Sequence, residues 1–154
     1  MTGYMAEMRK LVGHRTIIQC AASIICLDEK NRILLGKRTD NLKWGYAGGA
    51  VEIDEYTEDC AKRELKEEMG LTADELEFFF INSGPETHYI YPNGDEVSNV
   101  EIIYLCRKWR GEPHNLDGEM SELRFFDIDE IDISEISPPT RPVFVELKKR
   151  TKSL

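Results

Sequence analysis

The segment Thr57–Met69 constrains the fold most, because it contains no glycine or proline and is rich in Ala, Leu, Glu and Lys. These residue types favour a helix, and glycine directly after a helix is a typical stop signal. Gly70 follows the segment. We therefore predict a helix over Thr57–Met69.

Three glutamates of this predicted helix share one face. Glu64, Glu67 and Glu68 are spaced at i, i+3 and i+4, which places them within an arc of about 100°. Like charges at this spacing repel, and divalent cations are the simplest compensation. Carboxylate oxygens suit Mg²⁺ or Mn²⁺ better than zinc, and such ions commonly bridge to a pyrophosphate. The alternative is an acidic, solvent-exposed helix face.

The neighbouring residues are compatible with a charged centre. Arg63 lies beside the glutamates and can hold a carboxylate through two hydrogen bonds. Gly48 and Gly49 precede the helix and let the backbone approach that centre closely, because neither carries a Cβ atom.

The residues from 49 to 71 resemble the Nudix box at every defined position of that 23-residue pattern. The matching residues are Gly49, Glu55 after five residues and, after seven more, Arg63-Glu64-Leu65-Lys66-Glu67-Glu68-Met69-Gly70-Leu71. The flanking residues 34–38 and 44–49 are also similar to the strand and loop before the box. The resemblance covers about Thr16 to Ile131, most of the chain.

The resemblance implies an α+β fold, specifically an α/β/α sandwich. A mixed β-sheet would carry the Nudix-box helix on one side and a C-terminal helix. At 154 residues, we expect a single domain spanning 1–154. The implied activity is metal-dependent cleavage of a nucleoside diphosphate linked to another moiety, by attack of water on phosphorus.

The resemblance also implies roles for individual residues. The Mg²⁺ or Mn²⁺ ligands would be the Gly48 carbonyl, Glu64, Glu67 and Glu68. Arg63 and Glu55 match a salt-bridged pair that orients the helix. The general base varies in this family: it is either a box glutamate or a glutamate on a later loop, here Glu119 or Glu122.

Two residues depart from the family pattern. Ala47 stands where proline usually precedes the two glycines, and Asp54 stands where glycine usually precedes the box glutamate. Neither change removes a ligand. They affect the expected loop shape and substrate fit rather than the chemistry.

Candidate substrate contacts are Arg38, Trp44 and Tyr89. Arg38 can reach a phosphate, and Trp44 is either a base-stacking residue or part of the core. Tyr89 follows the box by 18 residues, where the resemblance associates tyrosine with dinucleoside polyphosphate cleavage. The substrates left open are nucleoside triphosphates, ADP-ribose or nucleotide sugars, and dinucleoside polyphosphates.

The remaining elements are predicted from apolar runs and turn residues. We expect a hairpin of two strands at 17–27 and 32–37, and a short strand running into a loop within 42–51. A strand at 75–81 follows the box helix. Asn93-Gly94 indicates a second hairpin, joining strands at 88–91 and 96–107. We also expect a strand at 123–128 and a second helix at 143–149. The predicted elements together are two helices packed against a mixed sheet.

Composition limits the partners. With 20 Lys and Arg against 29 Asp and Glu, the net charge is −9, which argues against nucleic-acid binding.

The longest uncharged run, Thr16–Leu27, is 12 residues, too short for a membrane span of about 20. The start of the chain has no apolar block typical of a secretory signal, and the four cysteines form no zinc or disulfide pattern. We expect a soluble, cytoplasmic protein.

Two further expectations come with the resemblance. A non-catalytic Nudix module that binds a nucleotide as a sensor is the alternative function, although such modules often lose box carboxylates and this sequence keeps them. Homodimers are common in the family, so a homodimer is expected here by resemblance alone.

Overall fold

The protein is described by a computed structural model covering residues 3–151. The expected domain limits at 1 and 154 lie outside the described residues. The described part contains three α-helices, α1 (Tyr4–Val12), α2 (Thr57–Met69) and α3 (Arg141–Thr151), and four short 3₁₀ turns. The prediction for α2 is confirmed at both ends. α1 was not predicted.

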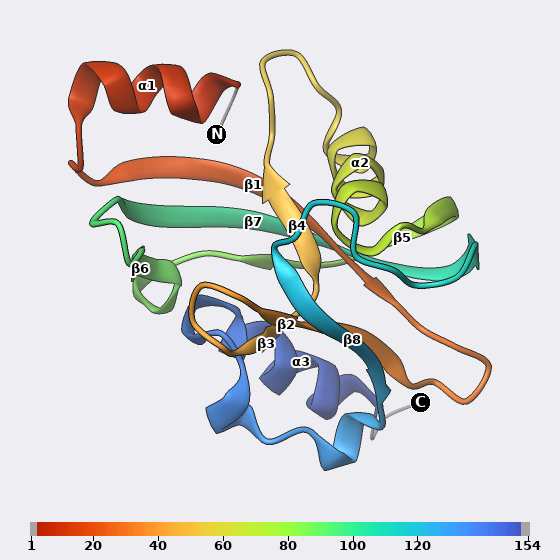
Figure 1. Cartoon of the computed structure of the whole chain (residues 1–154). Helices are drawn as coiled ribbons and strands as arrows, with labels where there is room; N and C mark the ends of the chain where they lie inside the picture. Colours follow the sequence, from red (N-terminus) through yellow and green to blue (C-terminus); the bar gives the residue numbers. More distant parts are fainter. Residues whose placement is uncertain (1–2, 152–154) are drawn as a thin grey trace.

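Two β-sheets form the centre of the protein (Figure 1). The larger sheet has the order β4-β1-β7-β5, with β6 also paired to β7. Its strands are β1 (Ile17–Cys26), β4 (Ala47–Ala50), β5 (Thr72–Asn82), β6 (His88–Ile90) and β7 (Glu96–Arg110). The smaller sheet has the order β3-β2-β8, with strands β3 (Trp44–Gly45), β2 (Ile33–Arg38) and β8 (Met120–Phe126).

The larger sheet is mixed, as predicted. β1 runs parallel to β7, whereas β4 and β5 are antiparallel to their partners. The predicted hairpin of β6 and β7 is confirmed by their antiparallel pairing, which joins His88 to Ser98.

The predicted hairpin of β1 and β2 is wrong. Only an isolated bridge between Leu27 and Ile33 connects them, and β2 pairs with β3 and β8 in the smaller sheet. The second half of β1 and the first half of β2 are buried. Strands buried on both faces need neighbours in two layers, so the chain crosses between layers after β1.

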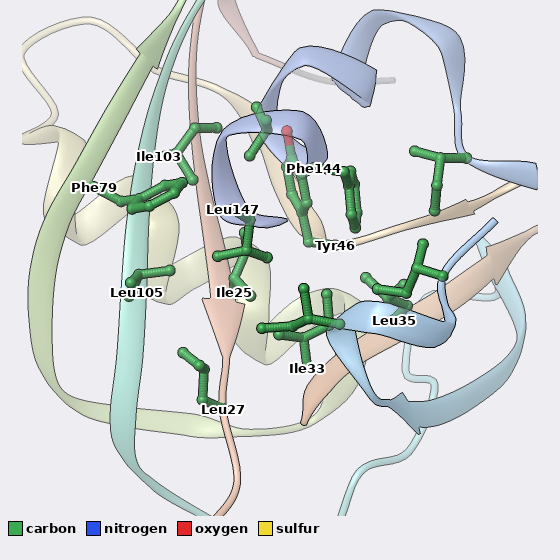
Figure 2. Packing of buried hydrophobic residues seen from close by; sticks show 14 of the residues in the cluster. Ile25, Leu27, Ile33, Leu35, Tyr46, Phe79, Ile103, Leu105, Phe144 and Leu147 are labelled. Atoms are coloured by element: carbon green, nitrogen blue, oxygen red, sulfur yellow. The ribbon is translucent and has the colours of Figure 1, made fainter. Parts of the chain in front are cut away.

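Two hydrophobic cores hold the layers together. Consecutive residues of a strand point to opposite faces. Ile25 therefore joins the core between the sheets and α3, whereas Ile24 joins the core under α2. Figure 2 shows the first core, where Tyr46 stacks on Phe144 with ring centroids 5.7 Å apart.

Helices α2 and α3 lie on opposite sides of the strands (Figure 1). This arrangement is the α+β sandwich expected from the sequence. α2 begins after Tyr56 and ends at Gly70, which adopts the left-handed conformation and donates its N–H to the Lys66 carbonyl. The buried residues of α2 fix its rotation, so its acidic face turns toward β4: Cys60, Ala61, Leu65, Glu68 and Met69.

Candidate functional site

The acidic face of α2 lines a cleft with a volume of about 500 Å³. Glu64, Glu67 and Glu68 all border it. Glu68 is buried, and its Oε2 accepts a hydrogen bond of 2.9 Å from the Gly48 N–H. The exposed fraction of the Glu67 side chain is 51%, compared with 14% for Glu64. The cleft therefore combines two sheltered carboxylates with one that faces solvent.

The two glycines of β4 allow close packing on two sides, Gly49 against α2 and Gly48 against β1. A Cβ at position 49 would stand 2.5 Å from Glu64 Cδ, and one at position 48 would stand 2.9 Å from Ser23 Cα. Contacts this short do not occur between real atoms. The glycines are therefore needed for space, which agrees with the close backbone approach predicted from the sequence.

Arg63 forms a bidentate ion pair with Glu55. Nε of Arg63 lies 2.9 Å from Glu55 Oε2, and Nη2 lies 3.0 Å from Oε1. The guanidinium holds the pKa of the Glu55 carboxyl at about 2. Nη1 of Arg63 also contacts Glu64 Oε1 at 2.9 Å and Glu67 Oε2 at 3.5 Å. Arg63 thus connects the turn before the helix to the carboxylates of the cleft.

The loop before β8 adds two acidic residues to the cleft. Carboxylate oxygens of Asp117, Glu119 and Glu68 lie within 4.8 Å of one another. Glu119 was a candidate from the sequence, but Asp117 was not. Its only sequence signal is an acidic pair around Gly118, which also fits an ordinary surface turn.

Glu122, the other candidate on this loop, lies elsewhere. It belongs to β8 opposite Lys37, is exposed and does not border the cleft. The structure therefore brings Glu119 into the cleft but not Glu122. The neighbour of Glu122, Leu123, packs against the core under α2, and consecutive strand residues point to opposite faces, so the Glu122 side chain points away from that core.

The cleft concentrates negative charge. Burial is the main cause that raises the pKa of Glu64 to about 7, and repulsion from Glu67 adds to it. Burial also raises the pKa of Glu68, and the Glu64 charge adds to this effect. The donor set consists of carboxylate oxygens, which are the ligands that Mg²⁺ and Mn²⁺ prefer. The residues present therefore fit a divalent cation, whose charge would relieve the repulsion.

A second cavity of about 110 Å³ adjoins the cleft. Both cavities are bordered by Arg38, Gly48, Gly49 and Tyr91. Arg38 forms a bidentate ion pair with Asp40, with distances of 2.9 and 2.8 Å. Arg38 was predicted as a substrate contact from the sequence, whereas Tyr91 was not.

Tyr89 borders only the second cavity. Its hydroxyl accepts a hydrogen bond of 3.3 Å from Asn41, and its ring packs edge-on against Tyr91 at 5.0 Å. Tyr89 therefore lies beside the cleft rather than in it.

Trp44 lies in the core, away from both cavities. Its side chain is buried in the cluster between the sheets and α3 and packs edge-on against Phe126 at 4.9 Å. The guanidinium of Arg124 covers the ring at 5.0 Å. The structure thus places Trp44 in the core, one of the two alternatives that the sequence left open, and Trp44 lines neither of the two cavities.

A family model for the NUDIX domain matches residues 18–147, and this match includes α2 and the acidic cleft. The chain belongs to the Nudix family. It is a Nudix hydrolase acting on acid anhydrides of phosphorus, because its relatives are named as diphosphatases and hydrolases.

This Nudix protein is similar in sequence to two relatives of known name. It is 26% identical over 137 residues to the 8-oxo-dGTP diphosphatase of Escherichia coli, with 86% of this chain and 97% of the relative covered. It is 34% identical over 125 residues to the oxidized purine nucleoside triphosphate hydrolase of Danio rerio, with 74% and 70% covered.

The fold of this Nudix protein is similar to that of the MutT NUDIX hydrolase from Burkholderia pseudomallei. The TM-score is 0.70 at 23% identity, covering 86% of this chain and 98% of the other. Within residues 3–151, no helix has both the length and the apolar character that crossing a membrane requires.

Proposed function

We propose that this Nudix hydrolase is a Mg²⁺- or Mn²⁺-dependent nucleoside triphosphate pyrophosphohydrolase, with oxidised purine nucleotides as its first candidate substrates. The observation that carries the proposal is the convergence of Glu64, Glu67 and Glu68 on a cleft that adjoins a second, polar cavity. The names of the two relatives support the choice of substrate class.

The metal ligands in this proposal are Glu64, Glu67 and Glu68 with the Gly48 carbonyl. A bound divalent cation supplies charge neutralisation of the phosphates and a lower pKa for the attacking water. Arg63 and Glu55 keep the ligand face of α2 in position. Arg38, which borders both cavities, binds the phosphate between the nucleoside and the cleaved bond.

Glu119 is the proposed general base outside the box. It faces the cleft, and its carboxylate lies near that of Glu68. A carboxylate at this place can accept the proton that water loses as it attacks phosphorus. A box glutamate such as Glu64, which borders the same cleft, is the alternative base.

The nucleoside belongs in the second cavity. Its lining contains amide and hydroxyl groups that can hydrogen-bond a base and a sugar, including Asn41, Asn99, Ser137 and Tyr89. The shared residues place this cavity directly beside the carboxylates. A substrate with its phosphates in the cleft would thus extend its nucleoside into the polar cavity.

The test is turnover of a substrate panel with Mg²⁺ or Mn²⁺, with products resolved chromatographically. The panel contains nucleoside triphosphates with and without an oxidised purine, ADP-ribose, nucleotide sugars and dinucleoside polyphosphates. We expect the wild type to cleave oxidised purine triphosphates and Glu67→Gln to lose this activity. Glu58→Gln should retain it, because Glu58 is exposed on the same helix and lies outside the cleft.

A second readout does not depend on activity. Mn²⁺ should raise the melting temperature of the wild type more than that of Glu67→Gln, because one ligand charge is removed. Equal shifts in both proteins would contradict the metal site. Tight nucleotide binding without turnover across the panel would favour the sensor alternative. The homodimer and the cytoplasmic location stay predictions.

A further inference from the structure

Glu101 is a buried carboxylate near the middle of β7. Its neighbours across the strands are Ala21 on β1 and Asn82 on β5. It is 8% exposed and has no ion-pair partner within residues 3–151. A buried charge without a cation is costly, so a carboxylate at this place needs a specific explanation.

Three neutral groups donate hydrogen bonds to Glu101. Ser23 Oγ donates to Oε2 at 2.6 Å, and Asn82 Nδ2 donates to Oε1 at 3.1 Å. The Tyr46 hydroxyl lies 3.0 Å from Oε1 and 3.1 Å from Oε2, so its single proton is shared. An ionised carboxylate has about four acceptor positions. Three protons therefore leave about one position available to a ligand.

The carboxylate borders the second cavity together with Ser23 and Tyr46. Glu101 borders only this second cavity, whereas Glu64, Glu67 and Glu68 border only the cleft. A negative charge here disfavours phosphate. Burial raises the pKa of the Glu101 carboxyl, and the hydrogen bonds from Ser23, Asn82 and Tyr46 oppose this shift, because they favour the ionised form. In that form the carboxylate only accepts, so the group that binds beside it must be uncharged or cationic and must carry an N–H or O–H donor.

Oxidation of a purine at C8 changes the hydrogen bonding of its imidazole edge. In guanine and adenine, N7 is an acceptor. In an 8-oxopurine, N7 carries a hydrogen and becomes a donor. A buried group that only accepts thus pairs with N7–H of the oxidised base and opposes the N7 lone pair of the parent base.

We propose that Glu101 is a specificity-determining residue that distinguishes 8-oxopurine nucleotides from their parent nucleotides by accepting a hydrogen bond from N7–H. The proposal rests on the proposed function, because it requires the base to occupy the second cavity. Sites built to bond a particular hydrogen reject analogues that lack it far more strongly than sites that read shape alone.

The test measures binding of the monophosphate products without metal, by calorimetry, for two pairs: 8-oxo-dGMP with dGMP, and 8-oxo-dAMP with dAMP. We expect the wild type to favour the oxidised member of each pair. Glu101→Gln should reduce both preferences about 10- to 100-fold, because the amide can accept from N7–H or donate to N7. Glu77→Gln, an exposed residue of β5, should keep the wild-type ratios.

A second variant covers the case in which Glu101→Gln does not fold. Tyr46→Phe removes one donor and keeps the carboxylate and the ring, so it frees an acceptor position and should preserve or increase both preferences. A lower preference in Tyr46→Phe would overturn the proposal.

Three other outcomes would also overturn it: no preference in the wild type, no nucleotide binding, or unchanged ratios in Glu101→Gln. Failure of the proposed function is a separate result, because it appears as absence of phosphoanhydride cleavage in the substrate panel. An enzyme that cleaves only ADP-ribose would retain the hydrolase assignment and overturn the role of Glu101.

Discussion

The carboxylate of Glu64 packs directly against Gly49: a Cβ at position 49 would stand 2.5 Å from Glu64 Cδ and closer still to Oε1. Gly49 is not among the residues with positive φ, so the requirement for glycine is one of space rather than backbone conformation. A methyl group here must move either β4 or a proposed metal ligand.

Gly49→Ala is therefore expected to reduce kcat by about 10²-fold, the loss typical of a displacement near 1 Å in an active site. The melting temperature should change less than the activity does. Glu58→Ala is the control, because Glu58 is exposed on α2 and borders neither cavity. Similar kcat values in the two variants would show that Glu64 does not need its present position.

Glu119 borders the cleft and Glu122 does not, so we expect their substitutions to change kcat by very different amounts. Glu119→Gln should lower kcat about 10²- to 10⁴-fold if Glu119 is the base. Glu122→Gln should leave kcat within about twofold, a surface change outside the site. The measurement is steady-state turnover of the best panel substrate. Equal losses in both variants would contradict the position that the structure gives to Glu122.

The ion pair of Glu55 with Arg63 predicts a pH dependence of stability. Because Arg63 lowers the pKa of folded Glu55 from 4.5 to about 2, the folded state favours the ionised carboxyl. This stabilisation is fully present above pH 4.5 and is lost as the pH falls toward 2. Urea unfolding at several pH values should show that wild type and Glu55→Gln converge in acid.

Glu58→Gln serves as the control for this titration. Glu58 is exposed on the same helix, so its replacement should leave the pH profile of the free energy of unfolding close to that of the wild type. A difference between wild type and Glu55→Gln that stays constant from pH 7 to acid would contradict the ion pair.

Asp54 adopts the left-handed backbone conformation, with a φ of 62°. This conformation is unfavourable for residues with a Cβ, and glycine adopts it freely. We expect Asp54→Gly to raise the free energy of unfolding by up to about 1 kcal/mol, partly offset by the entropy of glycine in the unfolded chain. Chemical denaturation measures this change.

Lys62→Gly is the comparison for Asp54→Gly. Lys62 lies inside α2, where glycine should cost about 0.5–1 kcal/mol. The two glycine substitutions should therefore have opposite signs. Destabilisation by Asp54→Gly would mean that the Asp54 side chain contributes more than its backbone conformation costs.

Local signals predicted some elements well. α2 was predicted with both ends correct, because helix-forming residues fill it and Gly70 ends it within the same short segment. The hairpin of β6 and β7 was predicted because the turn residues lie between the two strands in sequence. α1 was missed, since its nine residues carry only one buried side chain, Met5, and thus little apolar pattern.

Pairing between layers was not predictable in the same way. β1 and β2 are adjacent in sequence and both are apolar, yet they belong to different sheets. A strand buried on both faces gives no alternating pattern that would identify its neighbour. Trp44 could not be assigned to core or site either, because its segment is rich in glycine and has no alternating pattern that shows which side faces the core.

The sequence by itself determined the helix, the spacing of Glu64, Glu67 and Glu68 on one face, and the family. These features follow from residues close together in the chain, because the periodicity of a helix determines which side chains share a face. Only the tertiary structure decided that Glu119 and Asp117 face the cleft while Glu122 does not. It also decided that Glu101 meets Ser23, Tyr46 and Asn82. These neighbours come together only when β1, β4, β5 and β7 pair across long sequence separations, with Tyr46 directly before β4.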